Sequence, residues 1–149
     1  MVEQALKKHE LTIRNNNISI KLQLDELSLS IDSEQILSVF NNLISNAIKH
    51  SPKSGMIDIR LTDSKDGHIN FAIQDQGKGV SAGHEELIFE PFFVGKQNSK
   101  MTLRGTGLGL SIAKQYVDAH NGDIRVIESQ LGAIFQVTLP HTLVTSSNT

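Results

Sequence analysis

Residues 33–51 read SEQILSVFNNLISNAIKHS and carry the strongest structural signal in the chain. Asp32 or Ser33 can cap the first turn of a helix, and Gln35 stands three residues after Asp32, as in a capping box. The helix should end at Ser51, because the residue before a proline is disfavoured in the helical conformation. One face is apolar at helical spacing and is expected to be buried. This apolar stripe consists of Ile36, Val39, Phe40, Leu43, Ile44, Ala47 and Ile48.

The same helix carries a polar edge formed by Asn42, Asn46 and Lys49. At about 100° per residue, the three side chains fall within roughly 60° of one another. An amide oxygen suits a hard cation such as Mg²⁺, and the lysine offers a positive charge to a phosphate. An ordinary solvated helix flank would have the same composition, and the three residues on their own favour that simpler interpretation.

Composition limits the classes of protein that fit. The chain has 149 residues, enough for one domain with a substantial core. Its net charge of −2 argues against a nucleic-acid-binding protein. No apolar run approaches a membrane span, and the lack of cysteine excludes disulfides and thiolate zinc sites. Most glycines fall in one segment, which suggests backbone that must approach a ligand or move. Seven of the 11 are Gly77, Gly79, Gly83, Gly95, Gly105, Gly107 and Gly109.

The N-terminal part of the chain is expected to form a helix and a hairpin. Residues 2–14 have helical composition, and His9 is interpreted as an ordinary surface residue rather than a phosphoacceptor. No long helical hairpin can follow it before the strands begin. Alternating apolar residues then predict two strands, at 18–24 and 27–31, joined by a turn at Asp25 and Glu26.

The rest of the chain is expected to form four strands and one further helix. Segment 77–109 contains no long element, only a helical turn at 85–89, so it is either a functional loop or a wrong assignment. The pattern predicts an α/β (α+β) fold: a two-layer sandwich with a mixed, mostly antiparallel sheet of about five strands and helices on one face. The further expected strands are 55–62, 68–74, 124–128 and 133–139, and the helix starts at Leu108 or Leu110 and ends at His120.

Two glycine motifs could bind a ligand. Asp75-Gln76-Gly77-Lys78-Gly79 follows a strand directly, so its carboxylate could accept a hydrogen bond from the amino group of a base, although a simple turn has the same residues. Gly105-Thr106-Gly107-Leu108-Gly109-Leu110 opens a helix, where free N–H groups bind anions. Its spacing fits neither the dinucleotide fingerprint nor a P-loop. Phosphate binding is favoured slightly over a flexible hinge.

The order of the motifs is more specific than any one of them. The chain runs from Asn42…Asn46 through Asp75-x-Gly77-x-Gly79 and Ile88-Phe89-Glu90-Pro91-Phe92-Phe93 to Gly105-Thr106-Gly107-Leu108-Gly109-Leu110. This order resembles the N box, first glycine box, F box and second glycine box of the ATP-binding catalytic domain of bacterial sensor histidine kinases. That domain belongs to the gyrase–heat-shock chaperone–kinase–MutL superfamily. The resemblance covers residues 18–139.

The resemblance implies a role for each motif residue. Asn46 would hold Mg²⁺ against the phosphates with Asn42 nearby, Lys49 would touch a phosphate, and His50 would flank the base or ribose. Asp75 would accept the adenine amino group beside Gly77 and Gly79. Residues 79–104 would form a mobile lid over ATP, and the phenylalanines of the F box would anchor it or meet a partner domain. Further phosphate contacts would come from Lys96, Arg104, Gly105, Thr106, Gly107, Leu108, Gly109 and Leu110.

Two departures narrow the implied activity. The superfamily's ATP hydrolases place a general-base glutamate where this chain has Asn42, and an amide cannot take a proton at neutral pH. The helical hairpin that bears the target histidine is missing from this sequence. The implied activity is therefore protein-histidine kinase, in which Asn42 and Lys49 assist transfer from Mg-ATP to a histidine on a separate domain.

The resemblance also implies which partners the domain has and where it lies in a longer protein. The partners would be ATP or ADP, the dimerisation and phosphoacceptor domain of the same full-length kinase and, indirectly, a response regulator, with no contact to nucleic acid or membrane. The catalytic domain would span residues 1–141, before a disordered tail at 142–149, as the cytoplasmic part of an inner-membrane sensor. Two alternatives stay open: an ATPase of the same superfamily that drives conformational change, and a nucleotide-binding regulatory module without transfer activity.

Overall fold

The computed structural model of the chain describes residues 1–27, 31–93 and 108–140. From α3 onward the helices and strands lie close to the expected boundaries. The elements are α1 (Val2–Lys8), α2 (Glu10–Asn15), β1 (Ser19–Leu24), α3 (Ser33–His50), β2 (Met56–Asp63), β3 (His68–Gln74), the 3₁₀ turn η1 (Leu87–Phe89), α4 (Gly109–Ala119), β4 (Asp123–Glu128) and β5 (Ala133–Pro140).

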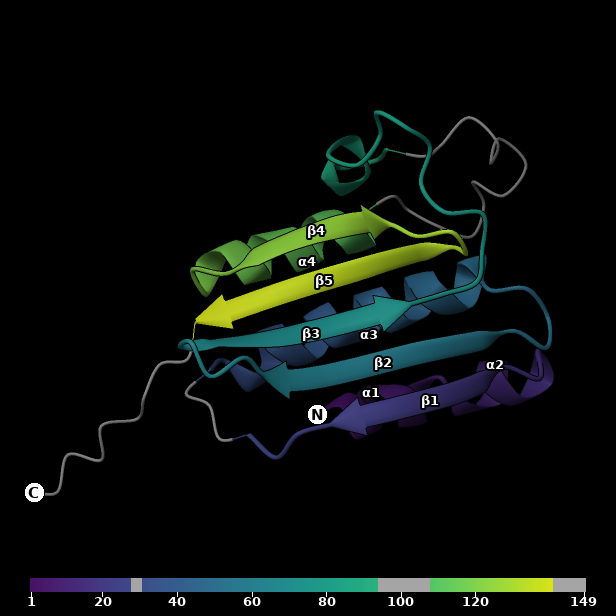
Figure 1. Cartoon of the computed structure of the whole chain (residues 1–149), viewed down its shortest axis with the longest axis horizontal. Coiled ribbons are helices and arrows are strands. Elements are labelled where there is room, and N and C mark those ends of the chain that lie inside the picture. Colours follow the sequence, from purple (N-terminus) through teal and green to yellow (C-terminus); the bar gives the residue numbers. More distant parts are fainter. Residues whose placement is uncertain (28–30, 94–107, 141–149) are drawn as a thin grey trace, which may run out of the picture.

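The strands form one sheet of five in the order β1-β2-β3-β5-β4. Strand β1 runs parallel to β2, and the other neighbouring pairs are antiparallel. Helices α1, α3 and α4 lie together on one face of this sheet (Figure 1). The predicted two-layer α/β sandwich with a mixed, mostly antiparallel sheet is confirmed.

The expected N-terminal hairpin is wrong. Strand β1 pairs with β2 in parallel, Ser19 opposite Met56, and the chain passes through α3 between them. Parallel neighbours need such a crossover, whereas the expected hairpin would have paired residues 18–24 with residues 27–31 in antiparallel fashion. Leu27 and Ile31 form no strand and instead line an apolar pocket between the helices and the sheet. The remaining residues of the expected second strand, 28–30, lie outside the described residues.

Helix α3 forms the centre of the core, as its sequence predicts. All seven residues of the apolar stripe are buried, and the side chain of Asp32 accepts a hydrogen bond from the Gln35 N–H at 3.1 Å. Phe40 packs on Phe71 of β3 with ring centroids 4.5 Å apart. Burying one large apolar side chain contributes about 1.5–3 kcal/mol, so this contact fixes α3 firmly against the sheet.

The N-terminal helix is broken at His9, which separates α1 from α2 with φ −102° and ψ 8°. The interpretation of His9 as an ordinary surface residue is also wrong, because its Nε2 atom is buried. The Oδ1 atom of Asn41 on α3 is buried as well. Burial, more than the neighbouring charge of Lys8, lowers the pKa of His9, whereas the interaction between the Asn41 and His9 side chains raises it.

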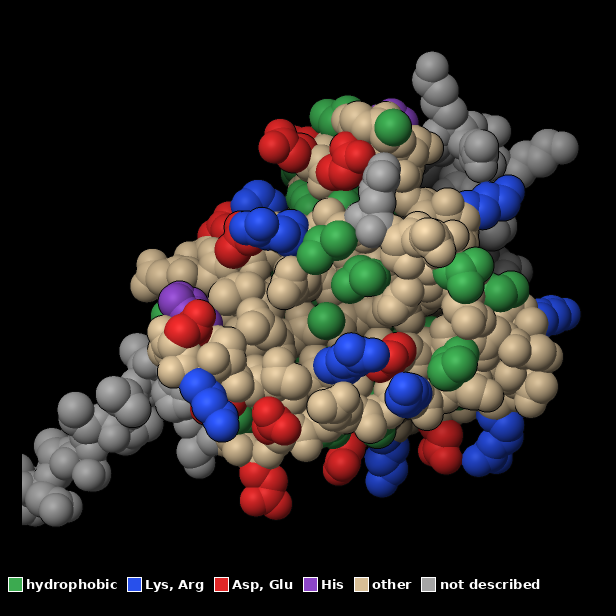
Figure 2. Space-filling view, viewed as in Figure 1, with side chains coloured by type: hydrophobic (Ala, Val, Ile, Leu, Met, Phe, Trp, Pro, Cys, Tyr) green, Lys and Arg blue, Asp and Glu red, His purple; other side chains and the backbone are tan. Residues whose placement is uncertain are grey.

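The other face of the sheet is a mixed surface, with apolar side chains scattered among charged ones (Figure 2). Side chains alternate along a strand, so the burial of Ile57 and Ile59 turns Asp58 and Arg60 to this face, where they pair at 3.1 Å. Pairs this exposed contribute little to stability. No helix in the described ranges is long and apolar enough to cross a membrane.

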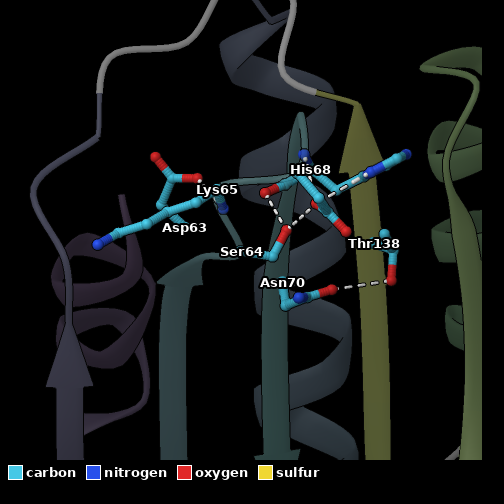
Figure 3. A network of polar contacts seen from close by, with 7 residues as sticks. Asp63, Ser64, Lys65, His68, Asn70 and Thr138 are labelled. Atoms are coloured by element: carbon cyan, nitrogen blue, oxygen red, sulfur yellow. Dashed lines mark hydrogen bonds and ion pairs between the residues drawn. The ribbon is translucent and has the colours of Figure 1, made fainter.

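A polar network closes the β2–β3 turn (Figure 3). The Ser64 hydroxyl donates to the His68 carbonyl at 2.6 Å and also contacts the Asp66 carboxylate. One strand away, the Thr138 hydroxyl donates to Asn70 Oδ1 at 3.0 Å and joins β5 to β3. This turn precedes β3, so it lies at the opposite end of that strand from Asp75.

Candidate functional site

The structure brings together three segments that are far apart in the sequence: the C-terminal half of α3, the turn after β3 and the start of α4. The backbone at Gly77 lies so close to α3 that a Cβ atom there would be 2.3 Å from the His50 carbonyl oxygen. A Cβ at Gly109 would lie 3.2 Å from Asn42 Oδ1. The N box on α3 therefore contacts both the first glycine box and Gly109, which belongs to the described end of the second glycine box.

Asp75 is the buried polar centre of this place, with 2% of its surface exposed. Its Oδ1 atom accepts hydrogen bonds from the N–H of Gly77 at 2.8 Å and of Ala133 at 3.4 Å. Among the described residues, no hydrogen bond engages the other carboxylate oxygen. Burial raises the pKa of Asp75, while the two N–H donors and the nearby His50 lower it. The residue can thus offer one fixed acceptor oxygen to a ligand.

The polar edge of α3 faces the same place. Asn42 is half-buried, its amide nitrogen lies 3.4 Å from the Ser38 hydroxyl, and its oxygen faces the start of α4. Asn46 is half-buried and Lys49 is exposed one turn further on. No group of three or more acidic, histidine or cysteine side chains within the described residues could hold a metal ion alone. Mg²⁺ usually keeps several waters and binds together with the phosphates of a nucleotide, so a site on this domain need not be formed by protein side chains alone.

His50 ends α3 beside Asp75, and its side chain is exposed. Partial removal from water lowers the pKa of His50, the negative charge of Asp75 raises it, and the positive charge of Lys49 lowers it further. The net shift in the pKa of His50 is downward, which favours the neutral imidazole. It can therefore contact a ligand without repelling a positive group.

The first turn of α4 offers backbone donors. Leu108 occupies the N-cap position, and no side chain of the described residues caps the helix there. The first N–H groups of a helix lack partners within the helix, so they are available to an anion. Ser111 is buried, and its hydroxyl donates to the Leu108 carbonyl at 2.8 Å, which fixes this turn.

Comparison with known proteins shows the family. A profile of the histidine kinase-, DNA gyrase B- and HSP90-like ATPases matches residues 31–143. The chain belongs to this ATPase family. It is 34% identical over 144 residues to the sensor protein KdpD of Clostridium acetobutylicum, covering 96% of this chain but 16% of KdpD. It is also 34% identical to the sensor histidine kinase WalK of Bacillus subtilis over 93% of this chain and 22% of WalK. The chain thus spans less than a quarter of these relatives.

Solved structures agree with this assignment. A solved chain of the mycobacterial sensor histidine kinase MprB superposes with a TM-score of 0.81 at 29% identity, covering 94% of this chain and 91% of that solved chain. A nucleotide-free catalytic domain of histidine kinase ThkA gives 0.82 at 29% identity, covering 94% and 91%. ThkA has also been solved in complex with the response regulator protein TrrA, with a TM-score of 0.78 at 28% identity, covering 95% of this chain and 39% of that one. The described chain is therefore a histidine kinase-type ATPase domain, and ATP is its implied ligand.

The predicted site residues of this ATPase domain divide into three groups. Asn42, His50, Asp75, Gly77 and Gly109 lie together, as described above. The neighbouring positions on the same segments are Asn46, Lys49, Gly79, Leu108 and Leu110, of which Leu110 packs against the hydrophobic core. Five predicted contacts lie outside the described residues: Lys96, Arg104, Gly105, Thr106 and Gly107.

The F box of the domain splits into an anchor and an exposed residue. Phe89 is buried and packs edge-on against Phe135 of β5, with centroids 6.2 Å apart. Phe93 packs edge-on against His84 at 5.2 Å. Phe92 is 71% exposed and holds a positive φ of 63°. Phe89 thus anchors this segment to the core, which is one of the two roles expected for the phenylalanines.

The β4–β5 turn contributes backbone hydrogen bonds to Asp75 that were not predicted from the sequence. The Ala133 N–H donates to Asp75 Oδ1, and the Asp75 N–H donates in return to the Ala133 carbonyl at 3.1 Å. Gln74 reinforces the join, because its amide donates to Ser129 Oγ at 3.0 Å. The only signal in the sequence was Gly132 between two expected strands, which is also typical of an ordinary turn.

Proposed function

We propose that this domain binds Mg-ATP and transfers the γ-phosphoryl group to a histidine on a separate dimerisation and phosphoacceptor domain of a longer sensor kinase. The observation that supports it most is the buried Asp75, whose Oδ1 is held by two backbone donors beside the polar edge of α3. A carboxylate in this setting suits an amino group, which favours adenine over guanine.

The residues of this chain would hold the nucleotide at both ends. Asp75 accepts from the adenine amino group, and His50 flanks the base or ribose. Asn46 coordinates Mg²⁺ together with the phosphate oxygens, with Asn42 beside it. Lys49 and the first N–H groups of α4 neutralise the negative charge of the phosphates. Phosphoryl transfer requires this, because negative charge is spread over the oxygens of the transferred group. Mg²⁺, held with the help of Asn46, would offset the negative charge that develops on the phosphates.

In the transfer step the bond between the γ-phosphorus and the bridging oxygen of ADP breaks. A bond forms between that phosphorus and a ring nitrogen of the acceptor histidine. Asn42 cannot accept a proton, so the acceptor domain or solvent removes the proton from the imidazole. This domain therefore contributes positioning and charge neutralisation. Asn42 cannot act as a base that activates water for hydrolysis of ATP.

The proposal extends to the wider assembly. The acceptor domain belongs to the same full-length kinase, and a response regulator then receives the phosphoryl group, by analogy with the ThkA–TrrA complex. The full-length protein would be an inner-membrane sensor with this domain in the cytoplasm, as the sensor proteins among its relatives suggest.

Phosphorylation in trans tests the function. The domain is incubated with γ-labelled ATP and the histidine-bearing domain of its full-length protein, and label on that domain is followed with time. We expect acid-labile label that depends on Mg²⁺ and is lost in the Asn46→Ala variant. Steady phosphate release without the acceptor would instead indicate an ATPase, and nucleotide binding without label would indicate a regulatory module.

A further inference from the structure

The β4–β5 turn packs directly on the carboxylate of Asp75, and Gly132 is the residue at the contact. A Cβ atom at Gly132 would lie 2.1 Å from the Asp75 carbonyl oxygen and 2.7 Å from its Oδ1 atom. Real Cβ atoms essentially never approach other heavy atoms this closely. Gly132 also holds a positive φ of 76°. The turn can therefore reach Asp75 only because this position has no side chain.

The turn is held in this position from both sides. The Gln74 amide donates to Ser129 Oγ at 3.0 Å and to the Leu131 carbonyl at 3.4 Å. A Cβ at Gly79 would lie 3.1 Å from the Gly132 carbonyl oxygen, so Gly132 lies between Asp75 and the far end of the first glycine box. Its backbone is therefore part of the wall around the carboxylate.

We propose that Gly132 is a positioning residue for base recognition, because it lets the Ala133 N–H reach Asp75 and so fixes the direction in which the carboxylate faces the base. This inference rests on the proposed function. With Oδ1 held by Gly77 and Ala133, the carboxylate cannot rotate, and its other oxygen keeps one direction. A methyl group at position 132 must displace either the Asp75 backbone or the turn, and both changes move the Ala133 N–H away from Oδ1.

The chain offers a matched control for this substitution. Gly67, in the β2–β3 turn, has a φ of 92°, and a Cβ there would meet nothing within 4 Å. Gly67→Ala therefore carries a similar backbone strain to Gly132→Ala, without the clash and at the opposite end of β3. Any effect specific to the contact with Asp75 should appear only in Gly132→Ala.

The test compares two nucleotides by calorimetry: ATP and purine ribonucleoside triphosphate, which lacks the amino group. A lost hydrogen bond to a charged group corresponds to roughly a tenfold or greater preference for ATP. We expect this preference in the wild-type domain and in Gly67→Ala, and a preference below about threefold in Gly132→Ala. A general loss of stability would lower the affinity for both nucleotides alike and leave the preference for ATP unchanged. An unchanged preference in Gly132→Ala therefore overturns the inference.

Two further outcomes are distinguishable. If the wild-type domain binds both nucleotides equally, the assignment of Asp75 to the adenine amino group fails, and the proposed function fails with it. If Gly132→Ala does not fold, as judged by circular dichroism, Gln74→Ala replaces it. This variant removes the two anchors of the turn without introducing a clash. We expect a partial loss of the preference for ATP, and full retention overturns the inference.

Discussion

The chemistry of the site depends on how one carboxyl group is held at the end of β3. Asp75 is nearly fully buried, yet its Oδ1 atom has two N–H donors, so burial does not leave the charge uncompensated. Because the carboxylate accepts only, it selects for a donor on the ligand. The same residue therefore holds the turn through its two N–H donors and would account for the proposed preference for adenine.

Replacing Asp75 by Asn should weaken ATP binding. The amide can turn a donor toward the adenine amino group, and a mismatched buried group costs about 1–3 kcal/mol. This corresponds to roughly a 5- to 150-fold increase in the dissociation constant. Calorimetry with ATP and GTP measures the effect. Equal binding of both nucleotides by the wild-type domain, or unchanged affinity in the variant, would contradict the role given to Asp75.

ATP binding should also depend on pH through Asp75. Burial raises the pKa of this carboxyl, so it takes up a proton at a higher pH than an ordinary aspartate does. Once protonated, it stops acting as a pure acceptor, and the affinity for ATP should fall as the pH falls through the raised pKa. Calorimetry over a pH series measures this decline. The Asp75→Asn variant is the control, since it keeps the titration of ATP and of His50 but lacks this step.

At the level of single residues, sequence predicted the residues that belong to motifs and missed those that act only through the fold. Asp75 and Asn42 were identifiable because their neighbours form recognisable patterns. Ala133 was not, because it acts through a backbone N–H that any residue except proline could supply. Gly132 resembled an ordinary turn glycine until the turn was placed against Asp75.

At the level of elements, α3 was predicted almost to the residue, because its cap, its apolar stripe and its following proline all agree. The N-terminal segment was predicted less well. Its break at His9 involves neither glycine nor proline, so no local signal marks it. The pairing of β1 with β2 is a long-range choice made across α3, and alternation within each strand is equally compatible with a hairpin.

The contact of the broken N-terminal helix with α3 should make stability depend on pH. Burial lowers the pKa of His9 in the folded domain. The unfolded chain therefore binds a proton near the ordinary histidine pKa of about 6.5, while the folded domain does so only at a lower pH. Stability should fall as the pH drops below that ordinary value, and level off once the folded form is also protonated.

Urea unfolding at a series of pH values, for the wild-type domain and for His9→Leu, measures this contribution. The variant should lose less stability between pH 7.5 and pH 5.5 than the wild type does, because one histidine with a lowered pKa has been removed. His50 also has a lowered pKa, so some dependence should remain in the variant. Parallel curves for the two proteins would show that His9 titrates alike in the folded and unfolded chains.

At the level of the whole molecule, the sheet separates a structural end from a ligand-binding end. The β2–β3 turn is closed by its own polar contacts, whereas the turn after β3 meets α3 and the β4–β5 turn. The two-layer architecture was predictable because helices with one apolar face must cover a sheet. The joining of the β4–β5 turn to Asp75 was not, because it depends on strand order, which places β5 beside β3.

Because three segments converge on one ligand, the nucleotide should stabilise the whole domain against heat. A ligand at 100 times its dissociation constant contributes about 2.7 kcal/mol, which corresponds to a rise in the melting temperature of roughly 5–10 °C for a domain of this size. We expect this rise with Mg-ATP and a smaller one when EDTA removes Mg²⁺, because in the proposed site the metal joins Asn46 to the phosphates.

Asn46→Ala should show the same small rise in melting temperature with and without EDTA. Ser45→Ala, at the exposed neighbouring position of α3, is the control and should respond like the wild type. An undiminished effect of EDTA in Asn46→Ala would place the magnesium ligand on another residue.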